Sequence, residues 1–182
     1  MDDSPTPRKI EEILNKTSPG LVMLYRDADL GTFGSLYRAG MVIREKGYTD
    51  ASRLGGGLVT THRYVILSNH FFNAAEFESG NGWGLCILQR DSYFKVLDVY
   101  ERQGKILITL LHVPDETWQI IDNVGRNLDK LFIEMSRMRF DEHLFAVPIP
   151  ALTVNNWRKR CLYPLGLNDK GEWFPLVDQA NH

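Results

Sequence analysis

The spacing of apolar residues along the chain changes near residue 57. Before this point the spacing is helical. Pro7 stands at a first helical turn, and apolar residues recur every three or four positions up to Leu14. A short apolar run at 20–25 predicts a strand, followed by a loop over 26–32. A second helix is predicted over 33–46, ending at Gly47, although Gly34 and Gly40 weaken it by roughly 1 kcal/mol each.

Beyond residue 57 the pattern favours strands. Runs rich in β-branched and aromatic residues predict strands over 57–69, 83–90, 93–100 and 105–113. The connections at 91–92 and 102–104 are short, which predicts an antiparallel meander around residues 57–113. If Gly104 closes a bulged turn, His112 should stand opposite Phe94. The strands are apolar at both odd and even positions, so we expect both faces of the sheet to be covered.

The remainder of the chain adds helices and a hairpin. Apolar residues at three- and four-residue steps predict a long helix over 115–140, capped by Asp115, that buries a stripe of Trp118, Leu128, Leu131 and Met135. Thr153 can cap a short helix ending at Arg160. The sequence 168–171 is typical of a hairpin turn.

These elements predict an α+β fold. We expect a mostly antiparallel sheet packed by two or three helices, with a small C-terminal hairpin. A length of 182 residues suits a single domain over 1–182, with frayed ends at 1–6 and 178–182.

The composition of the chain argues against nucleic acids and membranes as binding partners. The formal net charge of −2 gives no general attraction for nucleic acid, and Arg158–Lys159–Arg160 is the only basic cluster. No apolar run approaches the roughly 18 residues of a membrane span, and residues 1–14 do not resemble a signal peptide. We therefore expect a cytoplasmic protein without a membrane partner. Cys86 and Cys161 have no paired spacing, and both fit small buried apolar positions.

The segment 54–73 concentrates candidate chemistry. Gly55, Gly56 and Gly57 lead into a predicted strand that carries His62 and Arg63, and His70 follows that strand. Phosphate-binding glycine loops lead instead into a helix, so a mobile linker or bulge is the favoured interpretation of the glycines. On one straight strand the two histidines would lie roughly 26 Å apart. His62, Arg63 and His70 remain the catalytic candidates, because no nucleophile motif occurs elsewhere.

A second candidate segment, at 71–83, is rich in aromatic residues. Phe71, Phe72, Phe77 and Trp83 lie among glycine and asparagine residues. Such residues either anchor a partner or close the edge of a small core. Phe71, Phe72 and Trp83, together with the three glycines, are the candidate binding residues. Asp98, inside an apolar strand, either pairs with a cation across the sheet or protects a sheet edge, and the edge is favoured.

The sequence favours a non-enzymatic cytoplasmic protein with a binding or regulatory role, acting through protein–protein contacts with a partner or with a second copy. The five histidines show no metal-ligand spacing, so neither a metal nor a cofactor is expected. One alternative is a phosphoester- or nucleotide-acting enzyme that uses His62, Arg63 and His70 beside the glycine run. Another is a small-ligand carrier, because a sheet that is apolar on two faces can hold a pocket.

Overall fold

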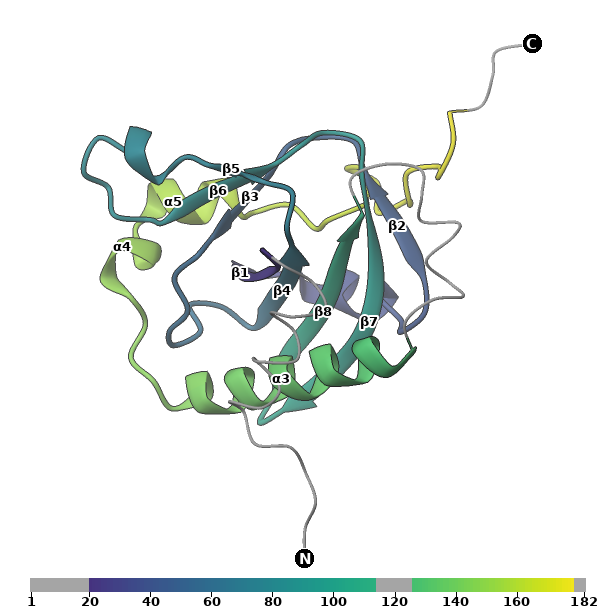
Figure 1. The fold of residues 1–182 in the computed structure, drawn as a ribbon, viewed down its shortest axis with the longest axis horizontal. Coiled ribbons are helices and arrows are strands. Elements are labelled where there is room, and N and C mark those ends of the chain that lie inside the picture. The colour runs from purple at the N-terminus through teal and green to yellow at the C-terminus, as the bar shows by residue number, and fades with distance from the viewer. Residues whose placement is uncertain (1–19, 114–125, 179–182) are drawn as a thin grey trace, which may run out of the picture.

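A single eight-stranded sheet organises the protein (Figure 1). The computed structural model describes residues 20–113 and 126–178. The strands follow the order β2-β7-β8-β4-β1-β3-β6-β5 across the sheet. Neighbouring strands are antiparallel, except for β4 and β8, which are parallel. The bounds are β1 Val22–Ala28, β2 Val42–Glu45, β3 Thr49–Ser52, β4 His62–Ser68, β5 Phe72–Asn73, β6 Leu85–Leu88, β7 Ser92–Arg102 and β8 Lys105–Val113.

The helices are few and lie outside the sheet. The long helix α3, Arg126–Leu144, crosses one face (Figure 1). The short helices α4, Pro150–Thr153, and α5, Asn155–Arg160, follow it, and two 3-10 turns, η1 at Gly31–Leu36 and η2 at Ala75–Phe77, occur earlier in the chain. The α+β class with a mostly antiparallel sheet is confirmed. Within the described residues, no helix is long and apolar enough to cross a membrane.

Both faces of the sheet are buried, as its two-faced apolar pattern predicts. On one face, Phe132 and Met135 of α3 pack against Leu67 and Leu97, and Phe140 packs farther along the same helix. The opposite face holds the larger cluster, which is covered by η1 and by the segment after α5. Its largest fully buried members are Leu24, Ile43, Tyr64, Ile66, Leu88, Phe94, Ile108 and Leu110.

Of the strands in the predicted meander, only β7 and β8 follow one another in the chain and also pair with each other. Their turn at Gln103 and Gly104 has positive φ angles, and Phe94 does stand opposite His112. By contrast, β6 pairs with β3 and β5, and β4 pairs with β8. A short connection permits a hairpin but does not require one. The burial of both faces of the sheet therefore decides which strands lie next to each other.

The predicted helix over 33–46 is wrong. A 3-10 turn ends at Leu36, and β2 pairs antiparallel with β7. Gly40 has a φ of +90°, which a helix does not allow. Gly34 is needed for another reason: a Cβ there would lie 2.2 Å from Nε2 of His62, so only glycine lets η1 approach β4 this closely.

Other predicted elements have mixed outcomes. The C-terminal hairpin is present, with Leu167 bridged to Trp173 around a turn closed by Gly171 and Asn168. Thr153 ends α4 and does not cap α5, which begins after Val154. The helix near Pro7 and the residues Asp115 and Trp118 lie outside the described residues.

Asp98 forms an internal ion pair and does not protect a sheet edge. Its two carboxylate oxygens accept hydrogen bonds from Arg137 of α3, both at 2.7 Å. Strand β7 lies between β2 and β8, so Asp98 is not on an edge strand. The edge interpretation is therefore wrong, and the ion pair attaches α3 to the sheet.

Candidate functional site

Arg26 is a buried cation on the inward face of β1. Alternation along the strand places Leu24, Arg26 and Ala28 on the same side, and only 4% of Arg26 is exposed. Its guanidinium donates hydrogen bonds to three carbonyl oxygens: Nη1 to Asp50 at 2.8 Å and to Arg160 at 3.1 Å, and Nη2 to Tyr163 at 3.0 Å. Arg26 therefore joins β1 to β3 and to the end of α5.

Arg26 forms no ion pair with a carboxylate of the described chain. Three arginines are buried in those residues, and the other two form ion pairs: Arg63 with Asp27 at 2.6 Å, and Arg44 with Asp91 and Asp178. The Nε of Arg26 is buried and has no hydrogen-bond partner there. A buried charge without a counter-charge is costly, and an anionic ligand would supply one.

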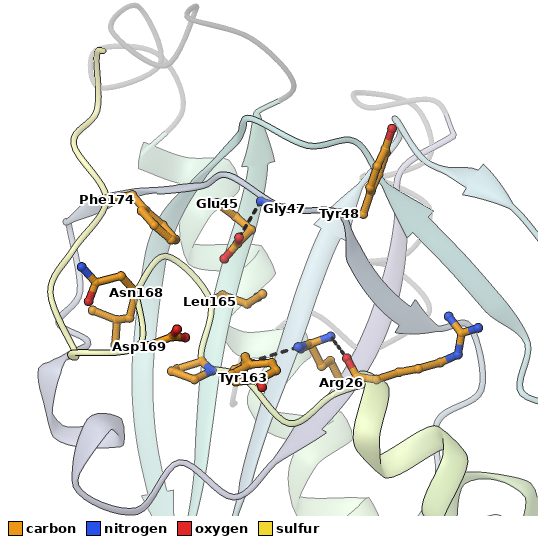
Figure 2. A pocket seen from close by; sticks show the side chains of 12 residues that line it. Arg26, Glu45, Gly47, Tyr48, Tyr163, Leu165, Asn168, Asp169 and Phe174 are labelled. Carbon is orange, nitrogen blue, oxygen red and sulfur yellow. Dashed lines mark hydrogen bonds between the residues drawn. The ribbon is translucent and has the colours of Figure 1, made fainter. Parts of the chain in front are cut away.

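Arg26 lines a cavity of about 440 Å³. Figure 2 shows it between the C-terminal segment and the strands β1 and β2, with Arg26 at its base. The cavity combines cationic, acidic and aromatic side chains, which is typical of sites for polar, partly aromatic ligands. The lining side chains of these kinds are Arg26, Glu45, Tyr48, Arg160, Tyr163, Asp169 and Phe174.

Glu45 presents a fixed carboxylate to this cavity. Its Oε1 accepts the backbone N–H of Gly47, and its Oε2 accepts that of Gly166, both at 2.8 Å. Each oxygen keeps a further lone pair, so the carboxylate can accept a hydrogen bond from a ligand. Gly166 has a φ of +83°, and a Cβ there would press on Ile43 at 3.1 Å. The N–H that holds Glu45 therefore depends on glycine.

A buried pair of tyrosines holds the wall of the cavity. Tyr64 donates to the hydroxyl of Tyr37 at 2.7 Å, and Tyr37 donates to the carbonyl of Leu165 at 2.7 Å. The N–H of Leu165 donates back to Tyr64. Burial raises the pKa of Tyr64 to about 12 and raises that of Tyr37 as well, so both hydroxyls keep their protons. The segment around Leu165 is therefore firmly placed.

Two exposed tyrosines stand at the rim. Tyr48 and Tyr163 are 67% and 64% exposed, although both line the cavity. Exposed aromatic rings of this kind stack on flat ring systems such as nucleobases. The second cation, Arg160, is paired with Asp50 at 2.7 Å and lies over the ring of Trp83. An adjoining cavity of about 640 Å³ shares Tyr163 and Asn168 with the first.

The sequence-based candidates His62, Arg63 and His70 have separate surroundings. Nδ1 of His62 bonds to the hydroxyl of Thr61, and its Nε2 is buried without a partner among the described residues. Arg63 donates to Asp27, to the carbonyl of Gly56 and to Nδ1 of His143 at 3.0 Å. His70 lines a different cavity, of about 370 Å³, together with His112. The structure thus places His143, not His62 or His70, against Arg63.

His112 lies in the middle of a hydrogen-bond chain that runs from Ser68 to Gln89. Ser68 Oγ lies 2.7 Å from Nδ1 of His112, and Nε2 of His112 lies 2.9 Å from Ser92 Oγ, which donates to the carbonyl of Gln89. Ser92 donates its hydroxyl proton to Gln89, so Nε2 of His112 donates to Ser92 and Nδ1 is the acceptor. The hydroxyl of Ser68 lies closer to Nδ1, at 2.7 Å, than to its other acceptor, the carbonyl of His70 at 3.1 Å, so it donates to Nδ1. Burial lowers the pKa of His112 to about 4. This neutral imidazole links three strands.

The three glycines pack against the segment that follows α3. A Cβ on Gly57 would lie 2.1 Å from the carbonyl oxygen of Ala146, one on Gly56 would lie 2.8 Å from Ile149, and one on Gly55 would lie 2.7 Å from His143. Gly57 also donates its N–H to Val147. The glycine run thus allows a close approach between two backbones, and the N–H of Gly57 is already engaged.

The aromatic candidates divide between surface and core. Trp83 is only 8% exposed and packs on Trp157, so its assignment as an exposed anchor is corrected. Phe72 is 57% exposed and stacks on Phe77, which is 71% exposed. Phe71 packs partly against the core. A binding role for Phe71 and Phe72 remains a prediction.

The residues that build the Arg26 cavity were missed by sequence reasoning. The sequence pattern predicts a loop at Arg26 and a helix at Glu45, whereas both residues lie in strands. A usable signal was present, because Arg26 has the same parity as Leu24 and Ala28 within an apolar run, which marks a buried charge. No comparable local signal marks Glu45, whose role depends on Gly166, 121 residues away. No cluster of three or more metal-ligating side chains occurs in the described part of the chain.

Comparisons with known proteins give a likeness of fold only. The sequence matches no protein-family description and no curated protein. The fold is similar to the C3 exoenzyme of Clostridium limosum, with a TM-score of 0.46 and 18% identity over 59% of this chain and 67% of that one. It is also similar to exoenzyme S from Pseudomonas aeruginosa, in a complex with human 14-3-3 protein beta and carba-NAD, with a TM-score of 0.46 and 15% identity over 69% and 64% of the two chains.

A third similar structure is the ADP-ribosyltransferase HopU1 of Pseudomonas syringae pv. Tomato, with a TM-score of 0.45 and 17% identity over 56% of this chain and 49% of that one. These neighbours are enzymes by name, and this finding overturns the interpretation of the chain as a non-enzymatic protein with a binding or regulatory role. At TM-scores below 0.5 they do not assign a reaction to this chain.

Proposed function

We propose that this chain is an enzyme that binds a nucleotide in the Arg26 cavity and acts on it. The observation that carries the proposal is the buried guanidinium of Arg26, which lines the cavity and has no carboxylate partner in the described chain. A phosphate group in the cavity would supply a counter-charge to this guanidinium. The class of enzyme is the nucleotide-acting alternative that the sequence left open, with a different set of residues.

The rest of the cavity matches the other parts of a nucleotide. Tyr48 and Tyr163 at the rim offer faces on which a base can stack. Glu45 offers a carboxylate, and such a group accepts hydrogen bonds from ribose hydroxyls or takes a proton from an attacking hydroxyl. Both of its oxygens are already oriented by backbone N–H groups, so little orientational freedom is lost when the ligand binds.

Turnover of a defined set of nucleotides tests this proposal. The full chain is incubated with ATP, ADP, ADP-ribose and NAD, and the products are separated by chromatography. We expect one or more of them to be consumed, and we expect Glu45→Gln to lower the rate by about 100-fold, as loss of a general base does. The matched control is Glu101→Gln, an exposed glutamate at the end of β7, which should keep the full rate.

Two results would contradict the proposal. The first is the absence of turnover and binding for every nucleotide in the set. The second is turnover that survives Glu45→Gln but is lost on His62→Ala or His70→Ala, which would return the site to the glycine-run segment.

A further inference from the structure

The strand that carries Glu45 is clamped from its other side by Asp178. Side chains alternate along β2, so Arg44 points away from the side of Glu45, and Lys46 follows directly after the strand. The carboxylate of Asp178 accepts from Nη1 and Nη2 of Arg44 at 3.0 and 3.2 Å, and from Nζ of Lys46 at 3.2 Å. Two of the three consecutive residues 44–46 are thus held by one carboxylate, and the residue between them is Glu45.

The segment 174–178 connects this clamp to the cavity. Phe174 lines the cavity and donates its N–H to the carbonyl of Gly166 at 2.9 Å. The carbonyl of Pro175 accepts from Arg44, and that of Leu176 accepts from Tyr93 at 2.6 Å. Gly166 in turn donates to Glu45. These contacts form a closed ring around β2, beside which the C-terminal segment runs in Figure 1.

Strand β2 needs such support because it lies at one end of the sheet. It is four residues long, and among the described residues its only neighbouring strand is β7. Short edge strands have free backbone groups on one side and open more readily than central strands. The C-terminal segment supplies contacts to β2 in addition to those of β7.

We propose that Asp178 is a positioning residue for Glu45, fixing the edge strand β2 so that the Glu45 carboxylate keeps its place in the cavity. The inference rests on the proposed function, because Glu45 is taken as the reacting carboxylate. Asp178 itself does not touch the ligand. It acts through Arg44, whose side chain is 8% exposed, and through Lys46.

Loss of the contacts of Asp178 should displace strand β2 but should change the free energy of unfolding of the whole protein only slightly. The Asp178 side chain is 70% exposed, and exposed ion pairs add little to the free energy of unfolding. Hydrogen bonds from Arg44 and Lys46 lower the pKa of Asp178 to about 2, so the carboxylate is charged at any working pH. Arg44 also keeps Asp91 as a partner when Asp178 is removed. We therefore expect a displaced strand within a folded protein.

Amide hydrogen exchange of the full chain tests the clamp without any nucleotide. In Asp178→Asn, we expect the amides of Gly47 and Gly166, which donate to Glu45, to exchange about tenfold faster. The amide of Ile66, in the central strand β4, should be unchanged, and Asp178→Glu should restore slow exchange. Unchanged exchange at Gly166 in Asp178→Asn would overturn the proposal, as would equal acceleration at Ile66.

Kinetics supply the second readout. With a nucleotide that is turned over, Asp178→Asn should lower kcat several-fold and leave KM nearly unchanged, whereas Glu142→Gln, at another exposed ion pair, should change neither. If exchange at Gly166 rises but no nucleotide is turned over, the proposed function fails and the clamp stands. If turnover is found but kcat is unchanged in Asp178→Asn, the positioning role is overturned.

Discussion

Arg26 and Tyr163 are joined by a hydrogen bond of 3.0 Å between a guanidinium nitrogen and a backbone carbonyl, across 137 positions of sequence. One side chain thereby shapes the cavity wall and places a cation beside the cavity. The three carbonyl oxygens around Arg26 stabilise the guanidinium by their dipoles but carry no net charge. A ligand with negative charge is what this arrangement lacks.

Acid should destabilise the protein through His112. Burial lowers its pKa to about 4 in the folded state, against 6.5 for an unperturbed histidine. Between these values the unfolded chain binds the proton more readily, so the free energy of unfolding falls as the pH drops from about 7 to 4, by up to about 3 kcal/mol. Urea titrations of wild type and His112→Gln at several pH values measure this. The mutant should show a flatter pH dependence, and equal slopes for the two proteins would show that His112 is not the responsible group.

The glycine run should prove structural. Gly57→Ala places a Cβ within 2.1 Å of a backbone oxygen, whereas Gly55→Ala meets the side chains of His143 and Tyr25 and no backbone atom among its nearest contacts. We expect Gly57→Ala to lower the free energy of unfolding by several kcal/mol, on the order of the larger single-mutation effects, and Gly55→Ala to cost less. Denaturation midpoints of the two variants decide this. Equal midpoints, together with lost nucleotide binding in Gly57→Ala, would point instead to a ligand role for the glycines.

The loss of stability on truncating a side chain of α3 should depend on how deeply that side chain is buried. Phe132 is 3% exposed and Leu131 is half-buried at the edge of the same cluster. Phe132→Ala should therefore cost about 3–5 kcal/mol, and Leu131→Ala less than a fully buried leucine would. Chemical denaturation gives both values. A larger loss for Leu131→Ala than for Phe132→Ala would mean that the helix is rotated about its axis.

The sequence was informative where one local pattern decided the structure. Alternating and two-faced apolar runs predicted β7, β8 and a sheet covered on both faces, and the Asn168–Gly171 turn predicted the hairpin. It was misleading for 33–46, where helical spacing of apolar residues coincided with a 3-10 turn and an edge strand. There, pairing with β7 outweighed local propensity.

The candidate site was harder to predict, because its parts are distant in sequence. Arg26 depends on carbonyls of residues 50, 160 and 163, and Glu45 depends on Gly166. The glycine and histidine run attracted notice by composition, but Asp27 and the segment after α3 already occupy its donors. Only the tertiary fold separates a satisfied arginine such as Arg63 from the unneutralised Arg26.

The place where a nucleotide binds tests the proposed Arg26 site directly. Amide chemical shifts of the full chain are recorded while ADP is added, for the wild type and for Arg26→Lys. We expect the shifts to concentrate at Gly47, Tyr163 and Gly166. We also expect Arg26→Lys, which cannot reproduce the planar fork of the guanidinium, to bind ADP at least about tenfold more weakly. Shifts centred on Gly55–Gly57 and His62, or unchanged affinity in Arg26→Lys, would contradict the proposed Arg26 site.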